Sequence, residues 1–184
     1  MVRLNGILTG LPLLGDDIKS QLGSTLLHRA MCQKLIERGA EITQTYQLNV
    51  GGNTDFENMV DRSRSKTKKF TKMEAIRDIV GTDVEINVGP SDYIPMLKDR
   101  KVAYIRIEGN SCLGMKFSIE TRLEVEDSPN SAGVAIDAIR VAGLALDRNL
   151  AGQIPEPSAF LFKYPPKKYA ENDIFNTMQD WLKD

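Results

Sequence analysis

The alternation of residues 117–125 constrains the fold of this chain more than any other feature of the sequence. On an extended strand, one face would carry the less polar side chains, which are Phe117, Ile119, Thr121, Leu123 and Val125. The residues between them are polar or charged and would share the opposite face. A strand with one wet face is typical of antiparallel or mixed sheets. The sequence therefore predicts such a sheet through this segment.

The rest of the chain mixes strand and helix patterns. Further strands are predicted over residues 4–9, 44–50, 84–88 and 102–108, with Gly89-Pro90 closing the strand at 84–88. Helices are predicted over 19–38, from Asn53 or Thr54 to about 61, from Thr71 to 80, from Ser128 onward, and over 156–162 and 171–183. The helix after Ser128 is expected to bury Ala132, Ile136, Ile139, Gly143 and Leu146. We expect an α/β fold with a central mixed or antiparallel sheet flanked by helices.

Charge and composition exclude some classes of function. Lys and Arg number 24 against 25 Asp and Glu, and this balance argues against broad binding of nucleic acid. No apolar run is long enough for a membrane span. The first residues lack the pattern of a signal peptide, and Cys32 and Cys112 lie far apart. We therefore expect free thiols and a cytoplasmic protein.

Residues 62–72 hold six basic groups and no acid. Such a patch in a neutral chain indicates either a discrete anionic ligand or a solvated loop, and the composition favours neither. Lys68 and Lys72 are four residues apart and would point the same way on a helix. Ser20 and Gln21 would lie at the start of the helix predicted over 19–38, where free backbone N–H groups favour an anion. Together these features predict a phosphorylated small molecule as the ligand.

Short polar blocks stand where extended segments are predicted to meet helices or turns, at residues 15–21, 49–55, 98–101 and 126–131. In α/β sheets, ligands usually bind at that edge. Each block also has a structural interpretation, since an aspartate or serine can cap a helix and paired glycines can make a turn. With residues 158–166, these blocks closely resemble the bacterial and archaeal myo-inositol-1-phosphate synthases, and the similarity runs from about residue 9 to 170.

The resemblance implies the catalytic and oligomerisation part of a two-domain, dehydrogenase-like enzyme. The family converts glucose 6-phosphate to inositol phosphate with NAD by oxidation, enolisation, intramolecular aldol closure and reduction. Residues 1–60 would join the cofactor half to the catalytic region, residues 61–128 would form the catalytic and oligomerisation sheet, and residues 129–184 would complete the core as a helical segment.

The resemblance also assigns the catalytic lysines, to Lys68, Lys72, Lys101 and Lys163. Lys68 and Lys163 would flank C5 of the substrate and serve redox and proton-transfer steps. Lys101 would stabilise the enolate or aldol oxygen, because an ammonium favours developing negative charge. Lys72 would bind the phosphate, together with Ser20 and Gln21.

The cofactor-side positions implied by the resemblance are Asp17, Asp55, Asp127 and Ser128. Asp99 would orient Lys101, and Asn53 is a second orienting residue. The single histidine, His28, is expected to be structural. No ligand set for a metal ion is legible in the sequence.

The chain departs from the family in having no G-x-G-x-x-G motif for the pyrophosphate of NAD. We therefore expect weak NAD binding and little turnover from these residues alone. Expected partners are a small sugar phosphate, further copies in a homotetramer, and a separate dinucleotide-binding chain, with no nucleic acid and no membrane. The strand at 117–125 would either form the interface between copies or pack on a helix. The alternatives to a synthase are a non-catalytic sugar-phosphate-binding or regulatory module and an assembly scaffold.

Overall fold

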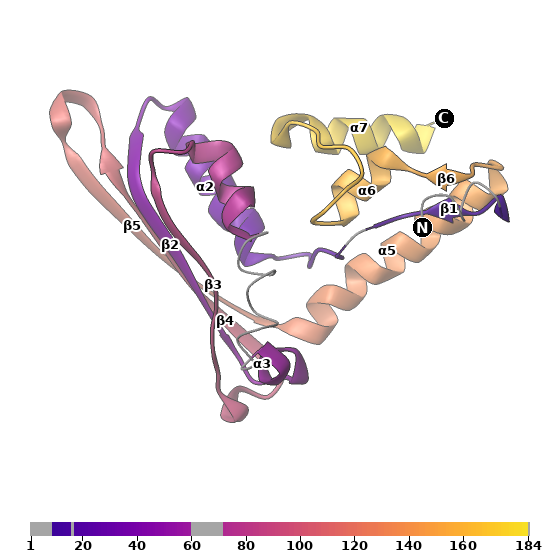
Figure 1. Ribbon diagram of the computed structural model, residues 1–184, viewed down its shortest axis with the longest axis horizontal. Coiled ribbons are helices and arrows are strands. Elements are labelled where there is room, and N and C mark those ends of the chain that lie inside the picture. Colours follow the sequence, from indigo (N-terminus) through magenta and orange to yellow (C-terminus); the bar gives the residue numbers. More distant parts are fainter. Residues whose placement is uncertain (1–8, 16, 60–71, 184) are drawn as a thin grey trace. The chain divides into compact units, whose positions relative to one another are not determined.

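The computed structural model describes residues 9–15, 17–59 and 72–183 (Figure 1). They belong to two compact units: unit 1 takes its residues from 1–21 and 129–184, and unit 2 from 22–128. Helices and a mixed sheet confirm the predicted fold class. Most of the strand predicted over 4–9 lies outside the described residues. The predicted division of the chain into residues 1–60, 61–128 and 129–184 concerned the role of each segment in the enzyme, and it stays a prediction.

Unit 2 is built on a sheet with the strand order β3-β2-β4-β5 (Figure 1). The strands are β2 (Glu41–Gly51), β3 (Glu85–Tyr93), β4 (Arg100–Asn110) and β5 (Lys116–Glu126). The β2–β3 pair is parallel, whereas β2–β4 and β4–β5 are antiparallel. Short 3-10 turns, η1 (Pro95–Leu97) and η2 (Cys112–Gly114), precede and follow β4. The predicted alternation along β5 is confirmed, because half-buried and exposed residues alternate over its whole length.

One face of this sheet packs on helix α2 (Ser24–Glu37) and on the helix that ends at Val80. The core between them is formed by the buried residues Cys32, Ile42, Ile105 and Ile107. Partly buried side chains from both helices surround that core, including Leu27, Met31, Leu35, Ile79 and Val80. Cys32 and Cys112 are free thiols, as predicted.

Two predicted boundaries in unit 2 are wrong. β3 continues through Gly89-Pro90 to Tyr93, because β3 is an edge strand and a missing proline N–H is tolerated there. The register with β2 also shifts beside Pro90, between Asn49 and Val50. Helix α2 begins at Ser24, with Gly23 as its N-cap, and not at residue 19.

The layer between α2 and β2 is polar where a hydrophobic core would be expected. His28 is fully buried, with Nε2 2.7 Å from Thr45 Oγ1 and Nδ1 3.3 Å from Gln47 Oε1. Ser24 Oγ donates to Asn49 Oδ1 at 2.9 Å, and Gln47 Nε2 donates to Ser24 Oγ at 2.9 Å. These bonds satisfy groups whose burial would otherwise be costly. They also explain why two polar residues, Ser24 and His28, lie on the buried side of α2 in line with Cys32.

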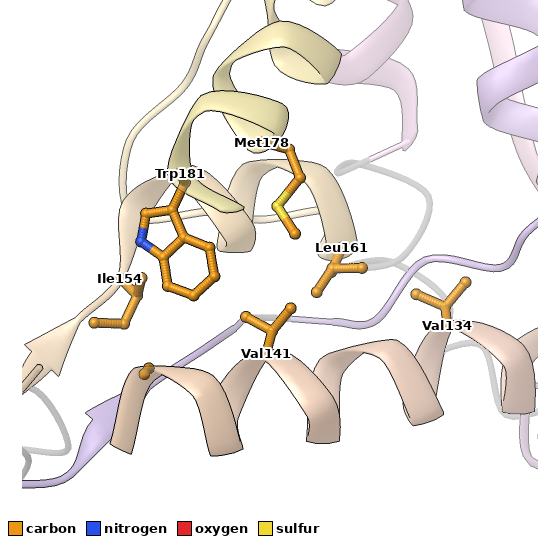
Figure 2. Close-up of a cluster of buried hydrophobic side chains, with 7 residues drawn as sticks. Val134, Val141, Ile154, Leu161, Met178 and Trp181 are labelled. Atoms are coloured by element: carbon orange, nitrogen blue, oxygen red, sulfur yellow. The ribbon is translucent and has the colours of Figure 1, made fainter. Parts of the chain in front are cut away.

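Unit 1 contains a short parallel pair, β1 (Pro12–Leu13) and β6 (Gly152–Gln153), and helices from the later part of the chain. The helices are α5 (Asp127–Asp147), whose first two residues are assigned to unit 2, α6 (Pro155–Leu161) and α7 (Glu171–Lys183). Their core consists of Val134, Val141, Ala145, Ile154, Leu161, Met178 and Trp181 (Figure 2). Figure 2 shows Trp181 and Met178 of α7 facing Val141 of α5. Among the described helices, none is long and apolar enough to cross a membrane.

The buried stripe predicted for α5 is wrong. Ile136, Ile139 and Leu146 are 57%, 71% and 48% exposed, and Ala132 is exposed as well. The buried side of the helix carries Val134 and Val141, because the side chains of α6 and α7 meet it there. Helix α5 therefore has apolar side chains on two sides, and within this structure only one of them is buried.

The buried imidazole gives a prediction about pH. Burial lowers the pKa of His28 from 6.5 to about 4, so the unfolded chain takes up this proton first as the pH falls. The free energy of unfolding should therefore be highest above pH 6.5 and should fall by roughly 3 kcal/mol on this account as the pH drops from 6.5 through 4. Urea unfolding of the wild type and His28→Gln across this range measures the effect. Equal pH dependence in the two proteins would assign it to other groups.

Candidate active site

Lys101, at the start of β4, forms an ion pair with the first residue of α5. Its Nζ atom lies 3.1 Å from Asp127 Oδ1, and the two side chains are 19% and 14% exposed. Lys101 is opposite Val125 in the β4–β5 ladder, so a helix that begins directly after β5 starts beside it. Since both groups are largely shielded from water, this pair is screened less than an exposed one.

The turn after β2 supplies the second partner of Asp127. Asn53 Nδ2 donates to Asp127 Oδ2 at 3.1 Å, so both carboxylate oxygens accept a hydrogen bond. Asn53 Oδ1 accepts from the backbone N–H of Phe56 at 3.3 Å and caps helix α3 (Thr54–Met59). The side chain of Asn53 is thus held at its oxygen and at its nitrogen, which is a suitable geometry for an orienting group.

The expected pairing of Asp99 with Lys101 is wrong. Asp99 Oδ1 accepts from Ser128 Oγ at 2.7 Å, and Asp99 Oδ2 accepts from the Ser128 backbone N–H at 3.0 Å. These bonds, with a further one from Asn53, lower the pKa of the Asp99 carboxyl, the Ser128 hydroxyl having the largest effect. Asp99 also places a carboxylate at the positive end of α5. We call Lys101, Asp127, Asn53, Asp99 and Ser128 the Lys101 cluster.

Lys163, in unit 1, pairs with Asp17. Lys163 Nζ lies 3.1 Å from Asp17 Oδ1, with the side chains 37% and 49% exposed. Ile18 and Phe162 form an isolated antiparallel bridge, and the Lys163 N–H donates to the Asp17 carbonyl at 2.8 Å. This bridge brings together residues that are 146 positions apart in the chain.

A residue that the sequence analysis missed secures this bridge. Lys19 Nζ donates to the Ala159 carbonyl at 2.7 Å, in the last turn of α6, where a cation is favoured. The Lys19 N–H donates to the Leu161 carbonyl at 2.9 Å. In the sequence, the only sign of this contact is that a lysine stands two residues after Asp17. No sequence pattern marks its partner, the Ala159 carbonyl on α6.

Ser20 and Gln21 do not lie in a helix, because α2 starts only at Ser24. The dipole argument for a phosphate at these residues is therefore wrong. They contact the beginning of α5 instead: the hydroxyls of Ser20 and Ser131 are 3.3 Å apart, and the Gln21 N–H donates to the Asn130 carbonyl at 3.0 Å.

The roles predicted for Lys68, Lys72 and Asp55 stay predictions. Lys68 lies outside the described residues, and Lys72 is the first described residue of the helix that ends at Val80. Asp55 is exposed in the first turn of α3. The Lys101 cluster belongs to unit 2 and the Asp17–Lys163 pair to unit 1.

At two of the positions expected to face NAD, the polar atoms already have protein partners. The Ser128 hydroxyl donates to Asp99, and both oxygens of Asp127 accept from protein donors. The sequence offers no glycine-rich loop for a pyrophosphate. Within the described part of the chain, no group of three or more His, Cys, Asp or Glu side chains could hold a metal ion.

The fold and these contacts define an α/β protein with lysine–aspartate pairs where strands and helices begin or end. A family model for myo-inositol-1-phosphate synthase matches residues 23–128, and the chain belongs to this family. It is 47% identical over 170 residues to an inositol-3-phosphate synthase of Mycolicibacterium smegmatis, with 89% of this chain and 47% of the relative covered. The corresponding protein of Corynebacterium glutamicum is 45% identical over 171 residues, with the same coverage.

The fold agrees with the same family. The crystal structure of a myo-inositol-1-phosphate synthase-related protein from Thermotoga maritima matches with a TM-score of 0.83 and 30% identity. That match covers 94% of this chain and 46% of the Thermotoga chain. The chain thus spans about half the length of the relatives it matches.

Proposed function

We propose that this chain supplies the lysine side chains for the conversion of D-glucose 6-phosphate to 1D-myo-inositol 3-phosphate, a step of inositol and phospholipid biosynthesis. The observation that carries the proposal is the Lys101–Asp127 pair, a largely buried ammonium whose partner is fixed on both oxygens. Membership of the synthase family supports the choice of substrate. We place the reaction in the cytoplasm.

The proposed reaction requires a cation beside an oxygen atom that gains negative charge. Oxidation at C5 makes a ketone, removal of a proton from the neighbouring carbon makes an enolate, and the enolate carbon attacks the aldehyde within the same molecule. A fixed ammonium stabilises the enolate and aldol oxygens because it needs no rearrangement as charge develops. We assign this role to Lys101. Bound NAD would supply the hydride acceptor for the oxidation and the donor for the final reduction.

The remaining positions keep the roles that the resemblance gives them. Lys163 is proposed to transfer protons next to C5, with Asp17 holding its ammonium at 3.1 Å. Lys68 would share this role. Lys72, Ser20 and Gln21 are proposed to bind the phosphate, and Asp55 and Ser128 to lie on the cofactor side.

Removing the ammonium of Lys101 should lower the rate of the chemical step. In the complete enzyme we expect Lys101→Met to reduce kcat by roughly 100- to 1000-fold with little change in the KM for glucose 6-phosphate. The control is Lys34→Met, whose side chain is 71% exposed on α2 of the same unit. The measurement is inositol phosphate formed from glucose 6-phosphate. Full activity of Lys101→Met would remove Lys101 from the mechanism.

A second candidate is a non-catalytic sugar-phosphate-binding or regulatory module. A lysine held 3.1 Å from a carboxylate can bind an anionic ligand without taking part in proton transfer, and this geometry favours such a module. In that case, glucose 6-phosphate would bind to the completed protein without turnover.

The exposed apolar side of α5 supports the proposal that this helix packs against the other half of the family's fold. Ile136, Ile139 and Leu146 repeat at helical spacing on that side, which is the pattern of a buried face. A Cβ on Gly143 would meet nothing within 4 Å, so a partner can approach the helix closely there. The related Thermotoga structure contains this fold in a chain about twice as long. We propose that the dinucleotide-binding half, in the same or a second polypeptide, packs on this stripe.

This arrangement predicts that NAD affinity depends on α5. By isothermal titration, the 184-residue chain alone should bind NAD with a Kd well above the micromolar range. Co-expression with the remaining part of the Mycolicibacterium relative should give a complex that binds NAD tightly. Ile139→Lys should prevent the complex, whereas Arg140→Ala, at a 78% exposed side chain beside it, should not. Sub-micromolar binding by the chain alone would contradict the arrangement.

The open face of the sheet supports assembly of copies. Tyr46, Leu48 and Tyr104 are 38%, 39% and 45% exposed, and Leu48 lies opposite Tyr104 between β2 and β4. Around them, Arg106 pairs with Glu108 and Glu120, and Arg122 pairs with Glu124. An apolar centre with paired charges of both signs is complementary to a second copy of itself. We propose that this face forms the interface of a homo-oligomer, a tetramer in the family.

A charge in the centre of this face should weaken assembly. Sedimentation should show an oligomer for the wild type and smaller species for Tyr104→Lys, because a buried unpaired charge opposes association. Arg38→Glu, a charge change at an exposed residue just after α2, is the control and should leave assembly intact. A wild type that sediments as a monomer at all concentrations would refute this interface.

A further inference from the structure

The ends of three strands meet at the Lys101 cluster. Gly51, the last residue of β2, is opposite Lys101 of β4 and Tyr93 of β3. The Ile94 N–H then donates to the Gly51 carbonyl at 2.9 Å, which ties the segment after β3 to the end of β2. The turn that carries Asn53 therefore starts from a fixed point beside Lys101.

Gly52 makes the next contact, and it leaves no room for a side chain. A Cβ there would lie 2.4 Å from the backbone N of Lys98 and 2.6 Å from the carbonyl O of Ile94. Both are backbone atoms, so they cannot turn aside as a flexible side chain could. The turn after β2 is thus packed directly against the backbone of residues 94–98.

The segment on the other side of this contact is strained. Lys98 has φ 52° and ψ −121°, a conformation that favours glycine. Its N–H donates to the Pro95 carbonyl at 3.0 Å, and Asp99 follows directly. Strain of this kind persists only where the surroundings hold it in place, and the Gly52 backbone is part of those surroundings.

Asn53 transmits this packing to Asp127. Its amide nitrogen donates to Asp127 Oδ2 at 3.1 Å while its oxygen caps α3, so the position requires a donor and an acceptor on one short side chain. An aspartate there would place another carboxylate beside Asp127 and Asp99, and a serine would be too short to reach Asp127.

We propose that Gly52 is a positioning residue for Lys101. Its bare backbone seats the turn on residues 94–98, Asn53 is thereby held where its amide fixes the Asp127 carboxylate, and that carboxylate directs the Lys101 ammonium. The geometric part of this inference stands without the proposed function. Its value for catalysis rests on that function.

The test measures how readily Lys101 reacts with acetic anhydride in the 184-residue chain, by mass spectrometry. In Gly52→Ala the ion pair loses its support, and acetylation of Lys101 should rise roughly three- to tenfold, the effect of losing one hydrogen bond of ordinary strength. Lys163, paired with Asp17 in the other unit, is the internal reference and should not change. Gly143→Ala, at a glycine with open space around it, should leave both lysines unchanged.

Asn53→Ser covers the case in which Gly52→Ala does not fold. Serine still caps α3 but cannot reach Asp127, so a role limited to capping would leave the labelling of Lys101 as in the wild type. We expect the acetylation of Lys101 in Asn53→Ser to rise as it does in Gly52→Ala. Unchanged labelling of Lys101 in a folded Gly52→Ala or in Asn53→Ser overturns the proposal, and so does an equal rise at Lys163.

Activity of the completed enzyme separates this inference from the proposed function. If Gly52→Ala raises the labelling and also lowers kcat with KM unchanged, both are supported. If the labelling rises but the wild type forms no inositol phosphate, Gly52 still positions Lys101 and the proposed function fails.

Discussion

The Asp127 carboxylate is the group on which the polar end of unit 2 depends. One oxygen accepts from Lys101 of β4, the other accepts from Asn53 of the turn after β2, and the residue itself begins α5. Removing one partner of a largely buried ion pair typically costs about 3–5 kcal/mol, because the remaining charge is left without compensation. Strand β4, the cap of α3 and the start of α5 are therefore held in one arrangement by a single carboxylate.

Much of the fold could be predicted from local pattern. The strands at β2, β4 and β5 and the start of α3 were found because alternation and capping depend on neighbouring residues. The buried side of α5 was not found, because this helix is apolar on two sides. Which side is covered depends on α6 and α7, which follow later in the chain. The predicted end of β3 at Gly89-Pro90 was wrong for a similar reason. Only the sheet order shows that this strand lies at an edge, where a proline is tolerated.

In the candidate site too, the sequence predicted some features and missed those that depend on distant parts of the chain. The family resemblance pointed to Lys101 and Lys163, but the orienting partner expected for Lys101, Asp99, was not the observed one. Asp99 is two residues from Lys101, whereas the observed partner, Asp127, comes from the end of the neighbouring strand. The Asp17–Lys163 pair spans 146 positions and depends on a bridge between loops that has no periodic pattern. Pairings across such separations are decided by tertiary packing, which a single sequence does not display.

The polar layer between α2 and β2 has a consequence for how this family can vary. Apolar side chains tolerate exchange for others of similar volume, but hydrogen-bonded partners must match donor to acceptor. Ser24, His28 and Gln47 are bonded in one network that also includes Thr45 and Asn49, so a substitution at one of them leaves another without its partner. These positions should therefore change together among homologues or not at all, and their covariation would fix the register of this helix on its sheet.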